Sequence, residues 1–187
     1  MPRGPWTWQG WSTSVRSAAR NAPFAHATPA LGSASIDRIT GATLFFKAEH
    51  LQHVGAFKFR GACNAVFSLD DATAARGVVT QSSGNHGAAI ALACRLRGIP
   101  ATVVVPRSAP QVKLAAIADF GARIVPCDVC QDDRDRVTAQ VRAESGAELI
   151  HPFDDPRVIA GQGTVAFELL HQVAALDTLI APVSGGG

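Results

Sequence analysis

From Thr43 onward, short apolar runs alternate with longer segments in which apolar residues recur at helical spacing. The runs predict strands, and the longer segments predict helices. We expect strands at 43–47, 77–81, 102–105, 122–126, 148–151 and 178–183. Helices are expected at 57–68, 85–97, 111–120, 132–145 and 160–173. Strict alternation of strands and helices is typical of an α/β fold built on parallel sheets.

The spacing between predicted strands, roughly two dozen residues, leaves room for a helix in each crossover. In an open parallel sheet, ligands bind outside the carboxyl ends of the strands. Two glycine-containing segments, Ser82–Gly87 and Gly185–Gly187, directly follow predicted strands. The pattern therefore places both segments where such a fold forms its ligand site.

Lys58 lies between Phe57 and Phe59, with Gly55 and Gly61 nearby. An apolar environment disfavours the ammonium form of a lysine, which makes its amine available as a nucleophile and then as a base. The competing interpretation is an ordinary surface lysine near a helix start. The flanking residues favour a reactive amine.

Ser82–Gly87 combines two hydroxyls, an amide and two glycines immediately before a predicted helix. The free N–H groups of a helix start attract carboxylate or phosphate, and Ser82, Ser83 and Asn85 add donors. A simple helix cap is the alternative, but a cap needs only one such residue. His86 adds little by itself. The run predicts an anion site.

Gly185–Gly187 ends the chain after a predicted strand and can wrap a phosphate with backbone amides. A flexible tail is the competing interpretation, and the glycines alone do not decide between the two. A nucleotide-binding Rossmann domain is disfavoured because no G-x-G-x-x-G follows the first strand.

Composition narrows the possible functions. The chain has 187 residues, 47% of them hydrophobic and 17% charged, and a formal net charge of +2. That charge is too small to indicate a nucleic-acid partner, and no apolar run is long enough for a membrane span. The histidines show no metal-binding spacing, so no metal site is predicted.

Four cysteines are sparsely spaced, which is typical of reduced thiols in a cytoplasmic protein. Cys127 and Cys130 form a C-x-x-C pair, but no second pair follows at zinc-site spacing. Residues 1–27 contain arginines and no acidic residue, and their tryptophans lack a helical period. We expect a poorly ordered leader there, with an organelle transit peptide as the alternative.

Several ordered motifs resemble the fold-type-II pyridoxal-phosphate enzymes, specifically the serine/threonine dehydratase and serine racemase group. The motifs are Thr28-Pro29, Phe45–Glu49, Gly55–Gly61, Ser82–Gly87, His151–Pro156, Val158–Thr164 and Pro182–Gly187. The resemblance implies three-layer parallel sheets of the tryptophan-synthase-β-like type. It implies a complete small α/β domain at 61–154 and a partial large cofactor domain at 28–60 and 155–187.

The resemblance also implies roles for individual residues. Lys58 matches the lysine that holds the cofactor and moves the α-proton, and Phe57 precedes it as in the family. Ser82, Ser83, Asn85 and His86 match the loop that receives the substrate carboxylate, with Asn85 also near the cofactor ring. Gly185, Gly186 and Gly187 match most of the phosphate-binding glycine loop. Ala27 departs from the family, which often has arginine before the Thr-Pro pair.

The implied cofactor is pyridoxal 5'-phosphate, and the implied reaction is β-elimination of serine, threonine or a similar β-hydroxy amino acid to a 2-oxo acid and ammonia. Serine racemisation is the main alternative, because Ser83 matches the second acid/base of serine racemases. An inactive fragment of such an enzyme is a further alternative. The resemblance implies a homo-oligomer for the full-length form and a small amino acid as substrate, with no nucleic-acid or membrane partner.

Overall fold

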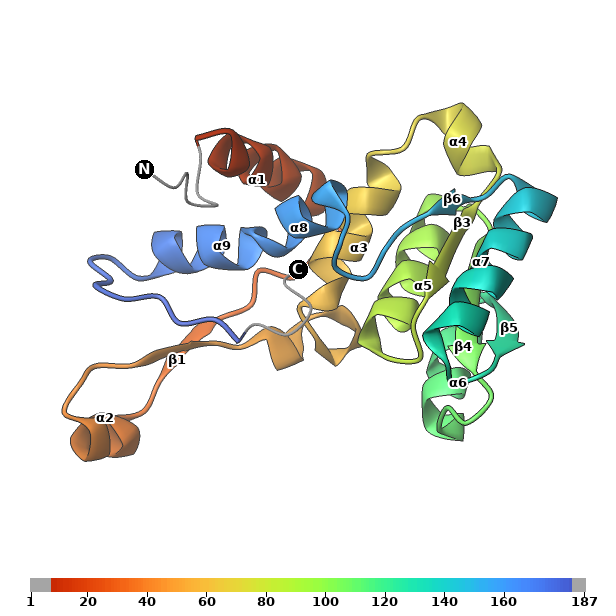
Figure 1. The fold of residues 1–187 in the computed structure, drawn as a ribbon. Coiled ribbons are helices and arrows are strands. Elements are labelled where there is room, and N and C mark those ends of the chain that lie inside the picture. The colour runs from red at the N-terminus through yellow and green to blue at the C-terminus, as the bar shows by residue number, and fades with distance from the viewer. Residues whose placement is uncertain (1–7, 183–187) are drawn as a thin grey trace, which may run out of the picture.

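A four-stranded parallel sheet dominates one end of the molecule in the computed structural model, which describes residues 8–182 (Figure 1). Its strand order is β5-β4-β3-β6, with β3 paired to β4 and β6, and β4 paired to β5. The strands are β3 (Val78–Gln81), β4 (Ala101–Pro106), β5 (Arg123–Cys127) and β6 (Glu148–Leu149). The parallel α/β architecture expected from the sequence is present here.

Helices cover both faces of this sheet. The covering helices are α5 (Asn85–Arg97) and α6 (Gln111–Ala118) on one face and α7 (Gln131–Ser145) on the other. Val103 and Val105 pack into the larger core with α5, whereas Val104 packs with Val137 and Val141 of α7. Successive strand residues point to opposite faces, so a continuous apolar run is what a doubly covered strand requires.

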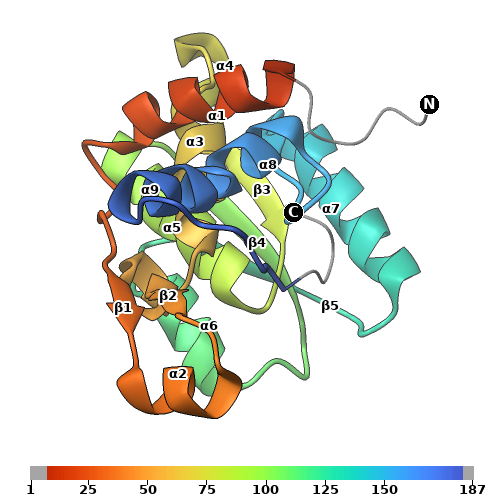
Figure 2. The same ribbon diagram turned by 90° about the vertical axis from the view of Figure 1, so that its left-hand side faces the viewer.

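Helix α3 (Lys58–Phe67) lies between the sheet part and a second group of helices in Figure 1, and that group is in front of it in Figure 2. It packs on α5 on one side, and on the other it contacts the helices α1 (Trp8–Asn21) and α8 (Pro156–Gln162). The contact with α8 is close, because a Cβ on Gly161 would lie 2.6 Å from the Arg60 carbonyl oxygen and 2.7 Å from the Gly61 Cα. Glycines at this crossing let the two helix backbones touch.

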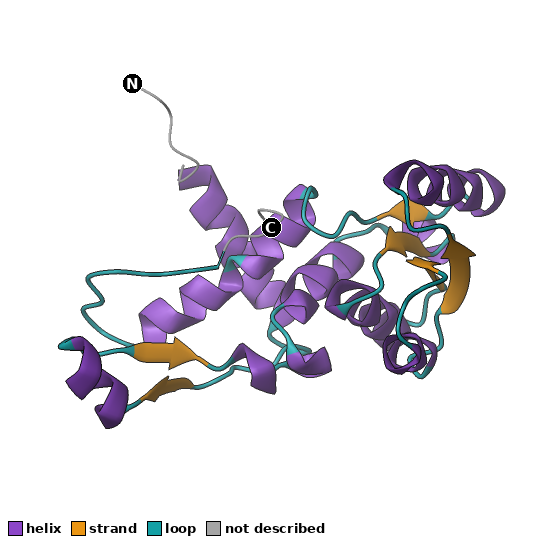
Figure 3. Cartoon of the chain, turned by 60° about the horizontal axis from the view of Figure 1, so that its bottom comes forward, coloured by secondary structure: helices purple, strands orange, loops and turns teal. Residues whose placement is uncertain are grey.

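A two-stranded antiparallel sheet lies at the opposite end of the molecule (Figure 3). It pairs Leu31 with Phe46, and a short helix crosses between its strands. These elements are β1 (Ala30–Gly32), α2 (Ala34–Thr40) and β2 (Phe45–Lys47). The strand expected at 43–47 therefore exists, but it pairs with the preceding segment and not with the parallel sheet. The remaining short elements are η1 (Glu49–Leu51), η2 (His53–Gly55) and α4 (Asp71–Ala75).

The prediction of a single helix at 160–173 was wrong, because two helices occupy residues 156–172. The Asp155 carboxylate caps α8 by accepting the Arg157 N–H, so that helix begins earlier than expected. The next helix is α9 (Thr164–Gln172). At the junction the Thr164 hydroxyl donates to the Gly161 carbonyl oxygen at 2.7 Å. Such back-bonding competes with the helical ladder and bends helices.

The strand expected at 178–183 is also absent over its described residues, 178–182. A strand exists only when a neighbour accepts its hydrogen bonds, and none of the described strands pairs with this segment. No helix within 8–182 is long and apolar enough to cross a membrane.

The prediction of a poorly ordered leader at 1–27 was wrong for Trp8–Asn21, because these residues form α1. Ser17 and Asn21 of this helix are buried, and the Asn21 side-chain amide donates to the Arg60 carbonyl oxygen at 2.9 Å. Polar contacts to α3 anchor this helix. The local sequence has no apolar period that would predict it. Residues 1–7 lie outside the described part.

Candidate active site

Lys58 is the first residue of α3 and follows a tight turn. Val54 and Gly55 in that turn have φ values of 56° and 67°, a left-handed conformation that is unfavourable for a β-branched residue. The Nζ atom of Lys58 donates to the Pro152 carbonyl oxygen at 2.9 Å and lies 5.2 Å from the centre of the Phe57 ring. Burial lowers the pKa of the Lys58 amine. The expectation of a desolvated amine agrees with this position.

The loop that holds Lys58 is itself shaped by hydrogen bonds. The Nδ1 atom of His151 accepts the Asp154 N–H at 2.8 Å, which closes the turn around Pro152. The Asp155 carboxylate then pairs with the Arg157 guanidinium at 2.6 Å, and hydrogen bonds from Arg157 lower the pKa of Asp155 despite its burial. The Lys58 amine therefore donates its hydrogen bond to a carbonyl group, that of Pro152, which the turn holds in place.

Arg60, two residues after Lys58, lies at the centre of a buried ionic cluster. Its guanidinium binds both carboxylate oxygens of Glu49, at 2.7 and 2.8 Å, and both of Glu168, at 2.6 and 2.9 Å. Lys47 adds a further ion pair to Glu168 at 2.7 Å. The cluster ties the first turn of α3 to η1, β2 and α9. Sequence reasoning did not single out this cluster.

The Ser82–Gly87 segment links β3 to α5, as expected. The Ser82 hydroxyl oxygen accepts the Gly84 N–H at 3.2 Å, which folds the turn back on itself. Gly84 is the N-cap of α5, and no side chain caps this helix. The simple-cap alternative therefore fails, and the first amides of a 13-residue helix are available to an anion.

Gly87 permits this turn. A Cβ there would lie 2.5 Å from the Ser82 carbonyl oxygen, a distance at which the backbone would have to move. Ser83 is half-buried, and Asn85 is exposed at the start of the helix.

His86 is buried, at 3% exposure, and both of its ring nitrogens lack a hydrogen-bond partner in the described structure. Burial, with the neighbouring Lys58 charge second, lowers the pKa of His86 to about 3. The imidazole is therefore neutral at physiological pH; the Ile150 backbone lies near enough to oppose the lowering of the pKa, but neither ring nitrogen makes a well-formed hydrogen bond. An unpartnered buried polar group of this kind requires an explanation, and a bound ligand supplies one.

A pocket of about 190 Å³ opens beside the start of α5. It is lined by Val54, Gly84, Asn85, Ala88, Lys113, Ala116 and Phe120. The structure thus brings the turn before Lys58 next to the Ser82–Gly87 segment. Lys113 was not assigned a role from the sequence, and nothing in its local pattern pointed to one. Gly185, Gly186 and Gly187 lie outside the described residues.

Comparison with known proteins is consistent with these features. A family model described as "Pyridoxal-phosphate dependent enzyme" matches residues 22–187. The chain is 54% identical over 175 residues to a protein named serine racemase from Oryza sativa subsp. indica, covering 93% of this chain and 52% of that protein. It is 52% identical over 165 residues to a beta-hydroxyaspartate dehydratase from Paracoccus denitrificans, covering 88% of this chain and 52% of that protein.

Among solved structures, maize serine racemase superposes with a TM-score of 0.92 at 50% identity, covering 94% of this chain and 53% of that one. The α/β fold with a parallel sheet, expected from the motifs, agrees with these matches. The chain spans about half the length of the curated relatives it matches.

Proposed function

Because the chain belongs to the family of pyridoxal-phosphate dependent enzymes, as its motifs predicted, we propose that its protein deaminates a β-hydroxy amino acid to a 2-oxo acid and ammonia. Serine, threonine and hydroxyaspartate are the candidate substrates, and related proteins with dehydratase and ammonia-lyase names support this class. The observation that carries the proposal is the desolvated amine of Lys58, positioned on the Pro152 carbonyl.

The residues present fit the cofactor. Lys58 offers an amine that burial pushes toward its neutral, nucleophilic form. The uncapped start of α5 offers amides to an anion, and buried His86 offers two unused ring nitrogens. Pyridoxal phosphate, when bound, supplies an electron sink for the negative charge that develops at the substrate's α-carbon.

Each side chain has a proposed task in this reaction. Lys58 would hold the cofactor and would take the substrate's α-proton at Nζ. Ser82, Ser83, Asn85 and His86 would orient the substrate carboxylate at the start of α5, and Asn85 would also contact the cofactor. Phe57 packs beside the amine, and Gly185, Gly186 and Gly187 hold the phosphate. Neutral His86 adds no charge to the amine and serves as an orienting group.

The test is covalent trapping of the cofactor at a specific lysine. We expect borohydride to fix pyridoxal phosphate on the Lys58 peptide of the wild-type chain and of Lys113→Ala, and mass spectrometry locates the label. Lys58→Ala should show none, and retention of a reducible linkage in that variant would overturn the assignment. Formation of 2-oxo acid from L-serine, L-threonine and hydroxyaspartate then ranks the substrates.

Racemisation is the second candidate. It is favoured by relatives named serine racemase and by the position of half-buried Ser83 on the loop beside Lys58's turn. A racemase needs an acid/base on the face opposite the lysine, and a hydroxyl at Ser83 supplies it. Chiral analysis of serine recovered from the reaction separates the two activities.

We further propose a cytoplasmic homo-oligomer for the full-length protein. All four cysteines are free thiols, three of them buried, in keeping with a reducing compartment. The β1–β2 sheet exposes Leu31, Phe45 and Phe46, each by at least 40%. Such apolar side chains gathered on one small sheet indicate a contact surface. Light scattering of the full-length protein measures the oligomeric state.

A further inference from the structure

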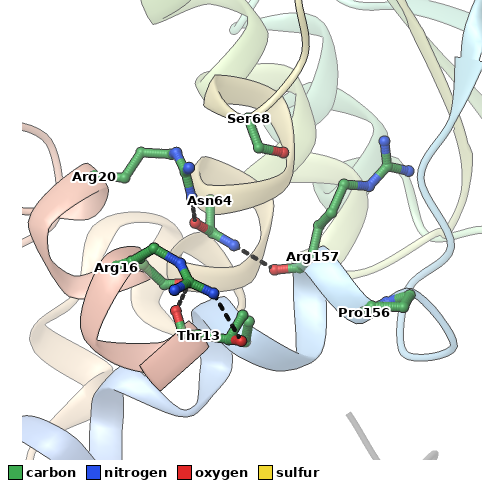
Figure 4. A pocket seen from close by; sticks show the side chains of 9 residues that line it. Thr13, Arg16, Arg20, Asn64, Ser68, Pro156 and Arg157 are labelled. Atoms are coloured by element: carbon green, nitrogen blue, oxygen red, sulfur yellow. Dashed lines mark hydrogen bonds between the residues drawn. The ribbon is translucent and has the colours of Figure 1, made fainter. Parts of the chain in front are cut away.

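A second pocket lies away from Lys58, where α1 crosses α3 and α8 (Figure 4). Its volume is about 190 Å³, and its lining includes Thr13, Arg16, Ser17, Arg20, Asn64 and Ser68. Asn64 lies on α3, six residues after Lys58, and Ser68 directly follows the helix, ten residues after Lys58. These separations correspond to ~9–15 Å along the helix axis. The pocket is thus distinct from the candidate active site.

Two positive charges face this pocket without a counter-ion. Arg16 and Arg20 are four residues apart on α1 and so share one face of the helix. Neither has a carboxylate within ion-pair distance among the described residues, and the pocket lining contains no acidic residue. Like charges at this spacing repel each other, so the arrangement favours an anion between them.

The third arginine at the rim does not add to this charge. The Arg157 guanidinium is neutralised by Asp155 at 2.6 Å and Glu148 at 2.9 Å, and in Figure 4 it points away from Arg16 and Arg20. Only its backbone carbonyl faces Asn64. The uncompensated charge therefore belongs to α1 alone.

The two arginines are held in place by neutral partners. Arg20 Nη1 donates to Asn64 Oδ1 at 2.5 Å, and Asn64, at 2% exposure, donates in turn to the Arg157 carbonyl oxygen at 2.6 Å. Arg16 Nη2 lies 3.4 Å from the Thr13 hydroxyl oxygen. A guanidinium has five N–H donors, so most of them stay available after these contacts. The site is organised before a ligand arrives.

We propose that this pocket binds a phosphate dianion, either free or as the head of a small phosphate monoester, between Arg16 and Arg20. Guanidinium groups form bidentate, charge-assisted hydrogen bonds with phosphate oxygens. Drug-sized ligands occupy pockets of ~300–1,000 Å³, so the smaller volume favours a compact anion and not a nucleotide. The bound anion bridges α1 to α3 and stabilises the docking of α1.

The test is thermal unfolding of the chain in increasing phosphate, against sodium chloride at matched ionic strength. A ligand that binds only the folded state raises the melting temperature. We expect phosphate to raise it in the wild type and in the control Arg38→Gln/Arg142→Gln, which removes two exposed arginines elsewhere. Arg16→Gln/Arg20→Gln should lose the rise, with phosphate affinity weakened at least about tenfold by isothermal titration.

An equal rise in Arg16→Gln/Arg20→Gln would overturn the proposal, because phosphate would then bind elsewhere, for example at the cofactor's phosphate site. No rise in the wild type would overturn it as well. A parallel titration with glycerol phosphate separates the two sources of the anion: tighter binding than phosphate assigns the pocket to a monoester, and weaker binding assigns it to the free ion. None of these readouts depends on the cofactor, so the result is independent of the proposed function.

Discussion

Arg60 and Glu49 form a two-pronged ion pair inside the molecule, with Nε–Oε2 and Nη2–Oε1 distances of 2.7 and 2.8 Å. Arg60 has no exposed surface, and Glu168 binds its other edge. Burial alone would lower the pKa of Arg60, but the hydrogen bonds that it donates to Glu49 and Glu168 outweigh burial and raise the pKa, so the group stays charged. A buried charge is tolerated only when it is paired in this way.

Arg60→Met should therefore be strongly destabilising. It leaves the half-buried carboxylates of Glu49 and Glu168 with one cation fewer, and removing one partner of a buried pair costs up to about 3–5 kcal/mol. Urea denaturation measures the change in unfolding free energy. Arg136→Met is the matched control, because the Arg136 side chain is exposed and a surface pair such as the one it makes with Asp133 contributes at most about 1 kcal/mol. Equal losses in the two variants would contradict the role of the buried cluster.

Lys58 should react with acylating reagents at a lower pH than an exposed lysine. Burial lowers its amine pKa, so a larger neutral fraction is present below the usual titration range. In competitive acetylation, the Lys58-to-Lys113 labelling ratio should fall as the pH is raised from about 8 to about 10. Accessibility does not change with pH, and so a constant ratio would contradict a lowered Lys58 pKa.

Protein stability should fall in mild acid because of His86. Its folded pKa of about 3 lies below the ordinary histidine value of 6.5, so between these values the unfolded chain binds a proton that the folded chain does not. The stability contributed by neutral His86 is full above pH 6.5 and is lost as the pH falls toward 3, by about 2 kcal/mol at pH 5.

The measurement is urea denaturation at pH 7 and pH 5. His86→Gln should reduce the loss of unfolding free energy between pH 7 and pH 5 by about 2 kcal/mol. His50→Gln, at an exposed position, should leave that loss unchanged. Identical pH dependence in the wild type and His86→Gln would mean that His86 is protonated in the folded state at pH 5.

Gly161→Ala should separate α8 from α3. The added methyl would meet the Arg60 carbonyl oxygen at 2.6 Å and the Gly61 Cα at 2.7 Å, and backbone atoms cannot rotate away. Overpacking of this kind costs about 1–3 kcal/mol. Gly84→Ala is the control, because nothing lies within 4 Å of a Cβ there and its φ of −127° suits any residue. Chemical denaturation of both variants decides whether the glycine contact is required.

Ser83→Ala should reduce racemisation of serine more than its deamination. The hydroxyl is the proposed proton donor on the face opposite Lys58, and elimination needs no group there. Product chirality and 2-oxo acid formation are measured on the same full-length enzyme. Equal loss of both activities would indicate that Ser83 only binds substrate.

The sequence predicted the sheet part closely because its signals are local. The helix 85–97 has its expected bounds, since Gly98 ends it in a left-handed conformation with φ 73°. The β-branched runs at 78–81 and 101–106 form strands because both faces of the sheet are covered. These features depend on residues within a few positions of one another.

The remaining differences depend on distant residues. Arg60 looks like any charged helix residue until Glu168, 108 positions away, is placed beside it. The helix at 8–21 is anchored by Asn21 on the Arg60 carbonyl, a contact between separate elements. The segment 178–182 has an apolar run but no neighbouring strand in the described structure. A local pattern carries no information about such partners.

The contact between Gly61 and Gly161 has a consequence for the evolution of the chain. The hundred or so residues between them leave and re-enter the rest of the molecule at adjacent points on one helix crossing. A segment whose two ends meet can be exchanged or inserted as a block without stretching its host. Exchange of the sheet part between relatives as one block is therefore geometrically feasible, provided that Gly61 and Gly161 are both kept.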